Sequence, residues 1–365
     1  MKKKFLTIAY IAAAIFATSC AKTEKVGPND AYQRYFDAWM HLNHPDAQPT
    51  GLGIYIIEEE LGNGENVGEA GQVFIDYKVT DLDGNISSYS DATTAKQLGT
   101  YKETTYYGPS FWSTAKTTLP AGVREAIVGA PIGTYRKIIV PSWLMSYQAY
   151  DSEEDYLNPP LKKDEKYDPS SYSNSIYEFT IRDYTENMDQ WQIDSIGRFF
   201  ANKVVKIDGK PAYETFVTTE GNQMTAADSV STGFYYKQLR APVDTASFPA
   251  DTTIYINYVG KLLNGLVFDT NVERVAKDNS LYTPGKAYGP TKIKWGEDYS
   301  SITMGSDEST VIAGFAKTLW EMKAMEKGVG VFYSNLGYSY SGSGSSIPGY
   351  SPLIFEIEIV AKPEE

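Results

Sequence analysis

Apolar and polar residues alternate from Ile254 to Leu262, so that one face of the segment is apolar and includes Tyr258. A period of two is typical of a half-buried strand. Asn264 and Gly265 then supply the left-handed backbone of a tight turn, and a second apolar run ends on Phe268-Asp269. The pattern predicts a hairpin that brings a tyrosine, a phenylalanine and a carboxylate close together.

The same strand-and-turn pattern occurs earlier in the chain. Three blocks recur in one order and without gaps: residues 75–84 with 256–265, residues 119–127 with 311–319, and residues 176–181 with 354–359. A fixed order of matching blocks indicates an internal duplication. The sequence therefore predicts two copies of one strand-rich domain.

Helical spacing marks two other segments. Asp30 and Gln33 resemble a capping pair, and an aromatic stripe follows them until His44-Pro45, which predicts a helix that docks on the first domain. Residues 188–203 form an amphipathic pattern between the copies and predict an interdomain helix. The polar stretches 152–175 and 272–298 have no period, and we expect both to be surface insertions.

Composition limits the possible functions. The 365 residues can bury two or three cores, and 42% hydrophobic with 22% charged residues describes a globular protein. A formal net charge of -13 argues against binding to nucleic acid, because little is available to neutralise phosphates. Partners are expected to be neutral or basic.

Metal and nucleophile chemistry have few candidate residues. The chain has two histidines, His41 and His44, which could share a helix face, but the sequence offers no evident third ligand beside them. We interpret them as surface residues at a helix end and expect no metal and no cofactor. With a single cysteine, Cys20, the chain has no internal disulfide and no cysteine nucleophile in its main domains.

The N-terminus has the features of an export signal. Lys2, Lys3 and Lys4 precede an apolar run, residues 5–16, that is too short to span a membrane. Phe16-Ala-Thr-Ser-Cys20 resembles the lipobox of bacterial lipoproteins, although an ordinary signal peptide with a chance cysteine is the alternative. Because the only cysteine falls at this place, we favour lipidation of Cys20 and a membrane attachment through this N-terminal lipid anchor.

Five segments of the second copy occur in a recognisable order: Phe234–Leu239, Asn257–Gly260 with Val267–Asp269, Val311–Phe315, Leu336–Tyr338 and Ile347–Phe355. They resemble the opening strand, the Tyr-x-Gly and Phe-Asp motifs, the helix start, and the last loop and closing strand of FKBP-type peptidyl-prolyl cis-trans isomerases. The likeness covers most of residues 230–361. It implies a twisted antiparallel sheet wrapped on a short helix.

The resemblance also implies an aromatic pocket that encloses a proline ring. Its implied catalytic residues are Tyr258, Phe268, Asp269, Ile312, Phe315, Tyr338 and Phe355, and its implied substrate-binding residues are Val311 and Ile347. Phe315 stands where the family most often has tryptophan, and Ser339 where it usually has glycine. The alternative is that these aromatic side chains only fill a core.

The first copy lacks part of this set. Ser87-Ser88 occupy the place of Phe268-Asp269, and Val123 that of Phe315, although Tyr77 still matches Tyr258. A pocket without its aromatic floor and carboxylate is expected to be inactive. Binding, spacing or packing are the roles that remain for this copy.

Together these observations predict an α+β protein with two FKBP-like domains, each an antiparallel half-barrel on a short helix. The expected divisions are a lipoprotein signal peptide at 1–20, a tether and helix at 21–49, a degenerate domain at 50–185, a helical linker at 186–229 and an isomerase domain at 230–365. The expected function is isomerisation of proline-containing polypeptides in the bacterial cell envelope, at the outer membrane. Alternatives are a non-catalytic peptide-binding or assembly lipoprotein and a structural envelope component.

Overall fold

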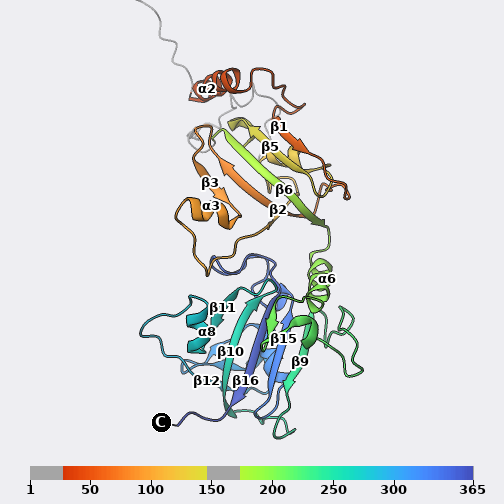
Figure 1. Cartoon of the computed structure of the whole chain (residues 1–365), viewed down its shortest axis with the longest axis vertical. Coiled ribbons are helices and arrows are strands. Elements are labelled where there is room, and N and C mark those ends of the chain that lie inside the picture. The colour runs from red at the N-terminus through yellow and green to blue at the C-terminus, as the bar shows by residue number, and fades with distance from the viewer. Residues whose placement is uncertain (1–27, 146–172, 365) are drawn as a thin grey trace, which may run out of the picture.

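The computed structural model describes residues 28–145 and 173–364. These residues form two antiparallel sheets that lie one beyond the other along the long axis of the molecule, with a helix at the far end of the first (Figure 1). Cys20, the rest of the predicted signal peptide and most of the predicted insertion 152–175 lie outside the described residues.

The first sheet has the strand order β1-β5-β6-β2-β3, and β4 also pairs with β2. A short helix, α4, packs Val123 and Ile127 into a core with Val73, Ile75 and Phe179. The elements are β1 (Tyr55–Glu60), β2 (Gln72–Thr80), β3 (Ile86–Tyr89), α3 (Ala92–Gln97), β4 (Ser110–Ser113), α4 (Ala121–Ile127), β5 (Tyr135–Val140), a 3-10 turn (Ser142–Leu144) and β6 (Ser175–Thr185).

The second sheet has the order β14-β13-β12-β10-β16-β15-β9, and β11 also pairs with β10. Its helix α9 packs Phe315 and Leu319 into the core. The elements are β9 (Phe234–Arg240), β10 (Thr253–Leu262), β11 (Val267–Thr270), α8 (Glu273–Asp278), β12 (Thr291–Lys294), β13 (Thr303–Met304), β14 (Ser309–Thr310), α9 (Ala313–Glu321), β15 (Lys327–Phe332), β16 (Leu353–Val360) and 3-10 turns at Tyr299–Ser301 and Ser334–Leu336.

Six strands of the second sheet repeat the order of the first, and β13 and β14 are additional. β1-β5-β6-β2 corresponds to β9-β15-β16-β10, with β3 and β4 in the places of β11 and β12. Tyr77 lies opposite Phe179 on β6, as Tyr258 lies opposite Ile357 on β16. The helices α4 and α9 begin at the matching residues Ala121 and Ala313. The blocks aligned in sequence therefore occupy equivalent positions in space.

The prediction that residues 272–298 are a surface insertion is wrong. This stretch contains α8 and β12, which correspond to α3 and β4 of the first unit, and Ile293 and Trp295 within it are buried. Even a tyrosine pair is repeated. Tyr101 and Tyr107 stack at 5.3 Å between ring centroids, and Tyr282 and Tyr288 stack at 5.4 Å. The polar composition of this stretch therefore does not indicate its short helix or its strand, which pairs with both β10 and β13.

Helix α2 (Pro28–Asn43) lies against the first sheet at the end of the molecule (Figure 1). Phe36 and Met40 are buried with Leu82 and Ile139. The helix begins at Pro28 instead of after a cap at Asp30, since proline suits a first helical position where no N–H partner is needed. The predicted aromatic stripe is only partly buried.

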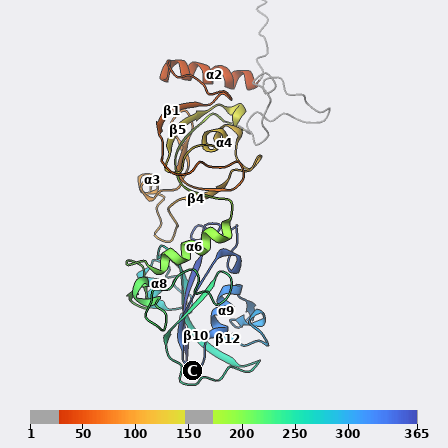
Figure 2. The same cartoon turned by 90° about the vertical axis from the view of Figure 1, so that its right-hand side faces the viewer.

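Helix α6 (Met188–Phe200) connects the two sheets and contacts both (Figure 2). Asn187 caps it by accepting a hydrogen bond from the Gln190 N–H at 3.0 Å. Phe199 and Phe200 pack into the core behind the second sheet, next to the small elements β7 (Lys206–Ile207), β8 (Lys210–Pro211) and α7 (Ala212–Thr215). Near its start, Trp191 packs on rings of the first sheet.

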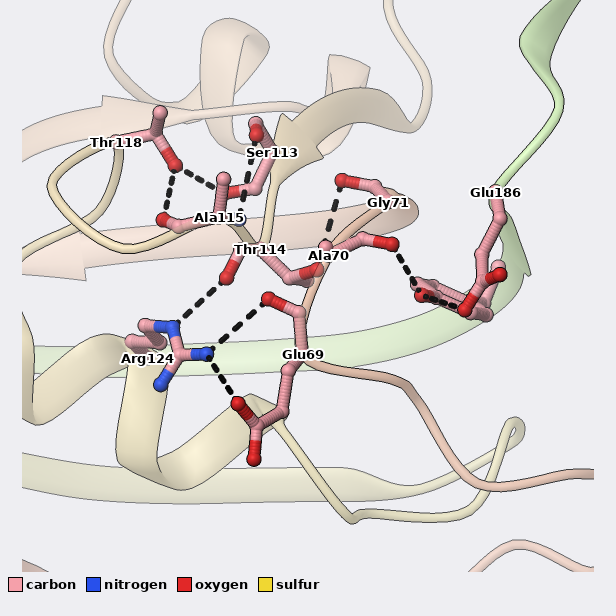
Figure 3. Close-up of polar contacts among 10 residues, drawn as sticks. Glu69, Ala70, Gly71, Ser113, Thr114, Ala115, Thr118, Arg124 and Glu186 are labelled. Carbon is pink, nitrogen blue, oxygen red and sulfur yellow. Dashed lines mark hydrogen bonds and ion pairs between the residues drawn. The ribbon is translucent and has the colours of Figure 1, made fainter.

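Arg124 ties α4 to two loops of the first unit, as Figure 3 shows. Its Nε donates to the Thr114 carbonyl at 2.7 Å, and its Nη2 donates to the Glu69 carbonyl at 3.1 Å. The Thr114 N–H donates in turn to the Gly71 carbonyl. Alanine, Ala316, occupies the matching position in α9. The second unit therefore has no equivalent of these guanidinium bonds. In the first unit they hold α4 in place, although its N-terminus has no side-chain cap.

Candidate functional site

The candidate site begins at the pairing of β10 with β11, which places Tyr258 beside Asp269. Gly260 pairs with Asp269, and Val259 pairs with Thr270. The Tyr258 hydroxyl donates a hydrogen bond to Asp269 Oδ2 at 2.9 Å. The hairpin thus brings together the tyrosine and the carboxylate that the sequence pattern predicts.

An aromatic cluster surrounds this pair. Phe315 from α9 meets Tyr258 edge to face at 5.7 Å and Phe355 of β16 at 5.0 Å, both between ring centroids. Phe268 of β11 meets Phe355 at 5.6 Å. Edge-to-face contacts suit the charge distribution of aromatic rings. Three elements distant in sequence therefore contribute one continuous aromatic wall.

Every apolar residue predicted for the site joins the same core cluster. Tyr258, Phe315, Ile347 and Phe355 are buried members, and the partly buried residues packed against them include Phe268, Val311, Ile312 and Tyr338. Asp269 is half-buried and is attached to the cluster by its bond to Tyr258. The structure brings all nine residues together, whereas their role at a site stays a prediction.

The hydroxyl groups at the cluster are held in their protonated form. Burial, followed by the charge of Asp269 and the hydrogen bond to it, raises the pKa of Tyr258 above its usual value. Burial and the charge of Asp269 also raise the pKa of Tyr338. Both tyrosines therefore remain hydrogen-bond donors at neutral and moderately alkaline pH.

Glycine at position 260 is required by the close packing of the cluster. A Cβ there would lie 2.6 Å from Phe268 and 2.9 Å from Phe355. Since such distances are below any ordinary contact, a side chain at position 260 would displace the rings. The sequence motif included Gly260, but its steric role becomes apparent only when β11 and β16 are seen on either side of it.

Asn271 is a supporting residue that the sequence analysis missed. Its Oδ1 accepts from the Tyr258 N–H at 2.8 Å, and its Nδ2 donates to the Ile256 carbonyl at 2.8 Å. In the first unit, Ser90 Oγ accepts from the Tyr77 N–H at 2.9 Å. The Asn271 amide thus attaches the segment that follows β11 to the backbone of β10. From sequence alone, only the alignment with Ser90 could have indicated this role.

The loop after β15 forms another side of the cluster. It carries Tyr338 and Ile347, and Ser339 between them has a φ of 54°, in the left-handed region that glycine favours. The N–H groups of Ser343 and Ile347 donate to each other's carbonyls at 2.7 and 3.1 Å. This small bridge fixes the backbone at Ile347.

At the matching place, the first unit has a hollow that is lined by Tyr77, Trp112 and Tyr177. Ser88 corresponds to Asp269, and its hydroxyl lies 3.4 Å from that of Tyr77. Because Val123 and Ser87 replace two phenylalanines, the space of about 430 Å³ is left open beside Trp112. The first unit therefore has the same strand pairing as the second here, but it lacks the carboxylate and two of the aromatic rings.

Metal ligands do not gather at either place. Within residues 28–145 and 173–364, no group of three His, Cys, Asp or Glu side chains is arranged to hold a metal ion. His44 instead lies 5.5 Å from the ring of Trp39 at the end of α2. The polar chemistry of the aromatic cluster consists of hydroxyl and carboxylate groups.

Comparison with known proteins locates a family likeness in the second unit. Residues 245–360 match the family model described as FKBP-type peptidyl-prolyl cis-trans isomerase. FK506-binding protein 2 of Dictyostelium discoideum is 30% identical over 134 residues, 37% of this chain and 80% of its own. FK506-binding protein 1A of Aspergillus fumigatus is 30% identical over 125 residues, 34% of this chain and 90% of its own.

Among solved structures, the three FKBP domains of wheat FKBP73 align with 86% of this chain and 98% of their own, at 14% identity and a TM-score of 0.26.

The residues that match the family model, 245–360, contain all nine predicted site residues. The sequence likeness and the aromatic cluster thus coincide in one part of the chain.

Proposed function

Because the chain belongs to the FKBP-type peptidyl-prolyl cis-trans isomerase family, we propose that its second unit isomerises X-Pro bonds of exported or envelope proteins. The observation that carries this proposal is the hydrogen bond from Tyr258 to Asp269 inside the aromatic cluster, within the matched residues. Placing a carboxylate beside phenylalanine rings in an ordinary core costs free energy and gains no packing. At a binding site, the carboxylate can instead hold the substrate.

The chemistry needs no nucleophile. Rotation about an X-Pro amide meets a barrier of about 18–20 kcal/mol, because the planar bond has partial double-bond character. The twisted transition state loses some of the charge separation between carbonyl and nitrogen, so apolar surroundings favour it over the planar state. In the proposed site, Phe268, Phe315 and Phe355 enclose the proline ring with Ile312.

The polar groups have the complementary role of holding the peptide. Tyr338 keeps its proton and can donate to a carbonyl of the substrate, while Asp269 and Tyr258 orient the chain at the other side. Val311 and Ile347 contact the residues that flank the proline. Such positioning keeps the amide where the apolar rings act on it.

The wider arrangement follows from the same proposal. The chain consists of two FKBP-like half-barrel domains, of which the first is degenerate because Ser88 replaces the carboxylate of Asp269. Lipidation at Cys20 anchors the protein at the outer membrane. Support for the anchor is the position of the only cysteine at the end of the lipobox-like segment. Incorporation of labelled palmitate, lost in Cys20→Ser, tests it separately.

Measurement of isomerisation tests the activity. The mature protein is expected to accelerate cis-trans exchange in a proline-containing tetrapeptide, and Phe315→Ala is expected to lose most of the acceleration because the floor of the pocket is removed. The control is Val123→Ala at the matching position of the first unit. Binding of the peptide with exchange at the spontaneous rate would instead establish the non-catalytic alternative.

A further inference from the structure

A cleft of about 310 Å³ lies between the two units, and neither unit forms it alone. The first sheet contributes Phe74 and Phe111, and α6 contributes Trp191. The second unit contributes the turn between β10 and β11 and the loop around Tyr350. No residue that lines the cleft is charged. Its volume is at the lower end for ligand sites, which suits one or two side chains rather than a large molecule.

The aromatic wall of the cleft is rigid. Phe74 and Phe111 stack at 4.6 Å, and Trp191 meets Phe111 edge to face at 4.8 Å, both between ring centroids. The Trp191 Nε1–H donates to Asp183 Oδ2 at 2.7 Å, which fixes the orientation of the indole. Rings that are already ordered bind an apolar side chain at little further entropic cost.

This wall remains partly open to solvent. Phe74, Phe111 and Trp191 are only half-buried, and Tyr340 at the edge of the cleft is 71% exposed. Concave surfaces with exposed aromatic rings mark binding sites more often than bare packing. The empty space is therefore suited to an uncharged side chain from outside the molecule.

The cleft and the aromatic cluster share one loop. Residues Tyr338 and Ile347 of this loop pack on the cluster, while Tyr340 and Tyr350 line the cleft. The Tyr350 N–H donates to the Ser339 carbonyl at 2.9 Å, which holds the two ends of the loop together. One loop therefore borders both the aromatic cluster and the cleft.

The first unit also holds this loop in place. The Tyr106 N–H donates to the Ser345 carbonyl at 2.9 Å, and Thr105 Oγ1 donates to Ser345 Oγ at 3.3 Å. Ser345 is at the tip of the small hairpin whose base is the bridge between Ser343 and Ile347. The first unit thus supplies a wall of the cleft and a support for the loop beside it.

From these observations we propose that the cleft is a second contact site for the polypeptide whose proline occupies the aromatic cluster. It binds one uncharged apolar side chain, aromatic or leucine, several residues away from that proline. This inference rests on the proposed function for the position of the proline. It gives the first unit a role in substrate selection, although that unit has no catalytic carboxylate of its own.

The test uses the mature protein and a series of peptides with one proline each. Phenylalanine is placed three to eight residues from the proline on either side, and a matched series has serine there. At one spacing, the phenylalanine peptide is expected to show a KM about tenfold lower, equivalent to 1.4 kcal/mol. Equal KM values for both series at every spacing would overturn the proposal.

A pair of tryptophan substitutions, one inside the cleft and one elsewhere on the surface, tests the location of the site. Ser110→Trp places an indole in the cleft, whereas Thr219→Trp adds the same group at an exposed position elsewhere. Ser110→Trp is expected to abolish the preference for phenylalanine while turnover of a short tetrapeptide stays unchanged. Persistence of the preference contradicts the proposal. Should Ser110→Trp fail to fold, Tyr340→Ser removes one wall at an exposed site and is expected to weaken the preference.

A direct binding measurement separates this proposal from the proposed function. In protein labelled with 5-fluorotryptophan, the ¹⁹F signal of Trp191, assigned with Trp191→Phe, is expected to shift on addition of the phenylalanine peptide and not the serine peptide. A shift without isomerisation of any peptide supports the cleft and refutes the catalytic proposal. Catalysis without a shift refutes the cleft.

Discussion

Replacement of Asp269 by alanine removes the group that most clearly distinguishes the two units. The carboxylate is half-buried on β11 and accepts the 2.9 Å hydrogen bond from the Tyr258 hydroxyl. Its loss leaves the aromatic rings in place. The change therefore separates the contribution of the polar pair from that of the apolar pocket.

The size of the effect follows from the type of bond. A hydrogen bond to a charged group contributes about 1.5–3 kcal/mol. If that amount acts in the transition state, kcat/KM falls by about 10-fold to 100-fold, at about 1.4 kcal/mol for each factor of ten. Stability also falls, by about 1–3 kcal/mol, because the buried Tyr258 hydroxyl loses its acceptor.

A second substitution distinguishes these two effects. Tyr258→Phe in the Asp269→Ala background removes the unpaired hydroxyl, so stability should recover while kcat/KM stays low. Both quantities are measured in the mature protein, by peptide isomerisation and by urea unfolding. Ser88→Ala, at the position that matches Asp269, is the control, and neither its activity nor its stability should change much.

Three outcomes would refute this reasoning. An unchanged kcat/KM in Asp269→Ala would show that the carboxylate has no part in catalysis. An equal loss in Ser88→Ala would show that the first unit contributes a site of its own, contrary to the interpretation of its hollow. Recovery of activity together with stability in the double variant would assign the whole effect to folding.

Three other predictions concern stability. Glu356→Gln should cost about 1.5–3 kcal/mol in urea unfolding, because it removes a buried carboxylate from the half-buried Lys261 ammonium. Glu358→Gln, in the more exposed pair on the same strand, should cost about 0–1 kcal/mol. Arg124→Ala should lower stability by about 1–3 kcal/mol by leaving two carbonyls without their donor, and Arg124→Lys should recover little of it. Burial raises the pKa of Tyr106 from 10.0 to about 12. Its protonated hydroxyl therefore stabilises the folded state fully below pH 10, and this stabilisation is lost between pH 10 and 12. In that window the unfolding free energy of the wild type, compared with that of Tyr106→Phe, should fall by about 1.4 kcal/mol per pH unit.

Much of the second sheet could be predicted from its residues because the strand period and the turn chemistry agree. The alternation around Tyr258 sets which side chains face the core, and Asn264 with Gly265 sets the turn. A slip of one residue would have put Tyr258 and Phe268 on opposite faces. The internal repeat supports the same register, since Tyr77 and Tyr258 lie opposite matching positions, Phe179 and Ile357.

Polar segments were harder to predict. Residues 272–298 lack a period because α8 spans only six residues and β12 only four, so neither element leaves a long apolar pattern. On α2, Leu42 is 79% exposed although Phe36 and Met40 of the same helix are buried. Local periodicity indicates which residues of a segment can be buried, but the surface that the segment packs against determines which of them are buried.

The cleft between the units could not be predicted at all, because its walls are brought together only by the docking of two sheets and α6. Phe74, Phe111 and Trp191 each have the sequence context of an ordinary core aromatic. Their half-exposed rings follow from the position of α6 between the units.

The comparison of the two units shows which part of the fold determines the chemistry. The six shared strands have the same order, the pairing around the tyrosine is equivalent and the helices begin at matching residues, so a common backbone frame does not by itself produce the tyrosine–carboxylate pair. The difference lies at a few side chains on that frame, chiefly Ser88 against Asp269 and Val123 against Phe315. If the second unit is an isomerase, these positions explain why the first unit, with the same strands, is not.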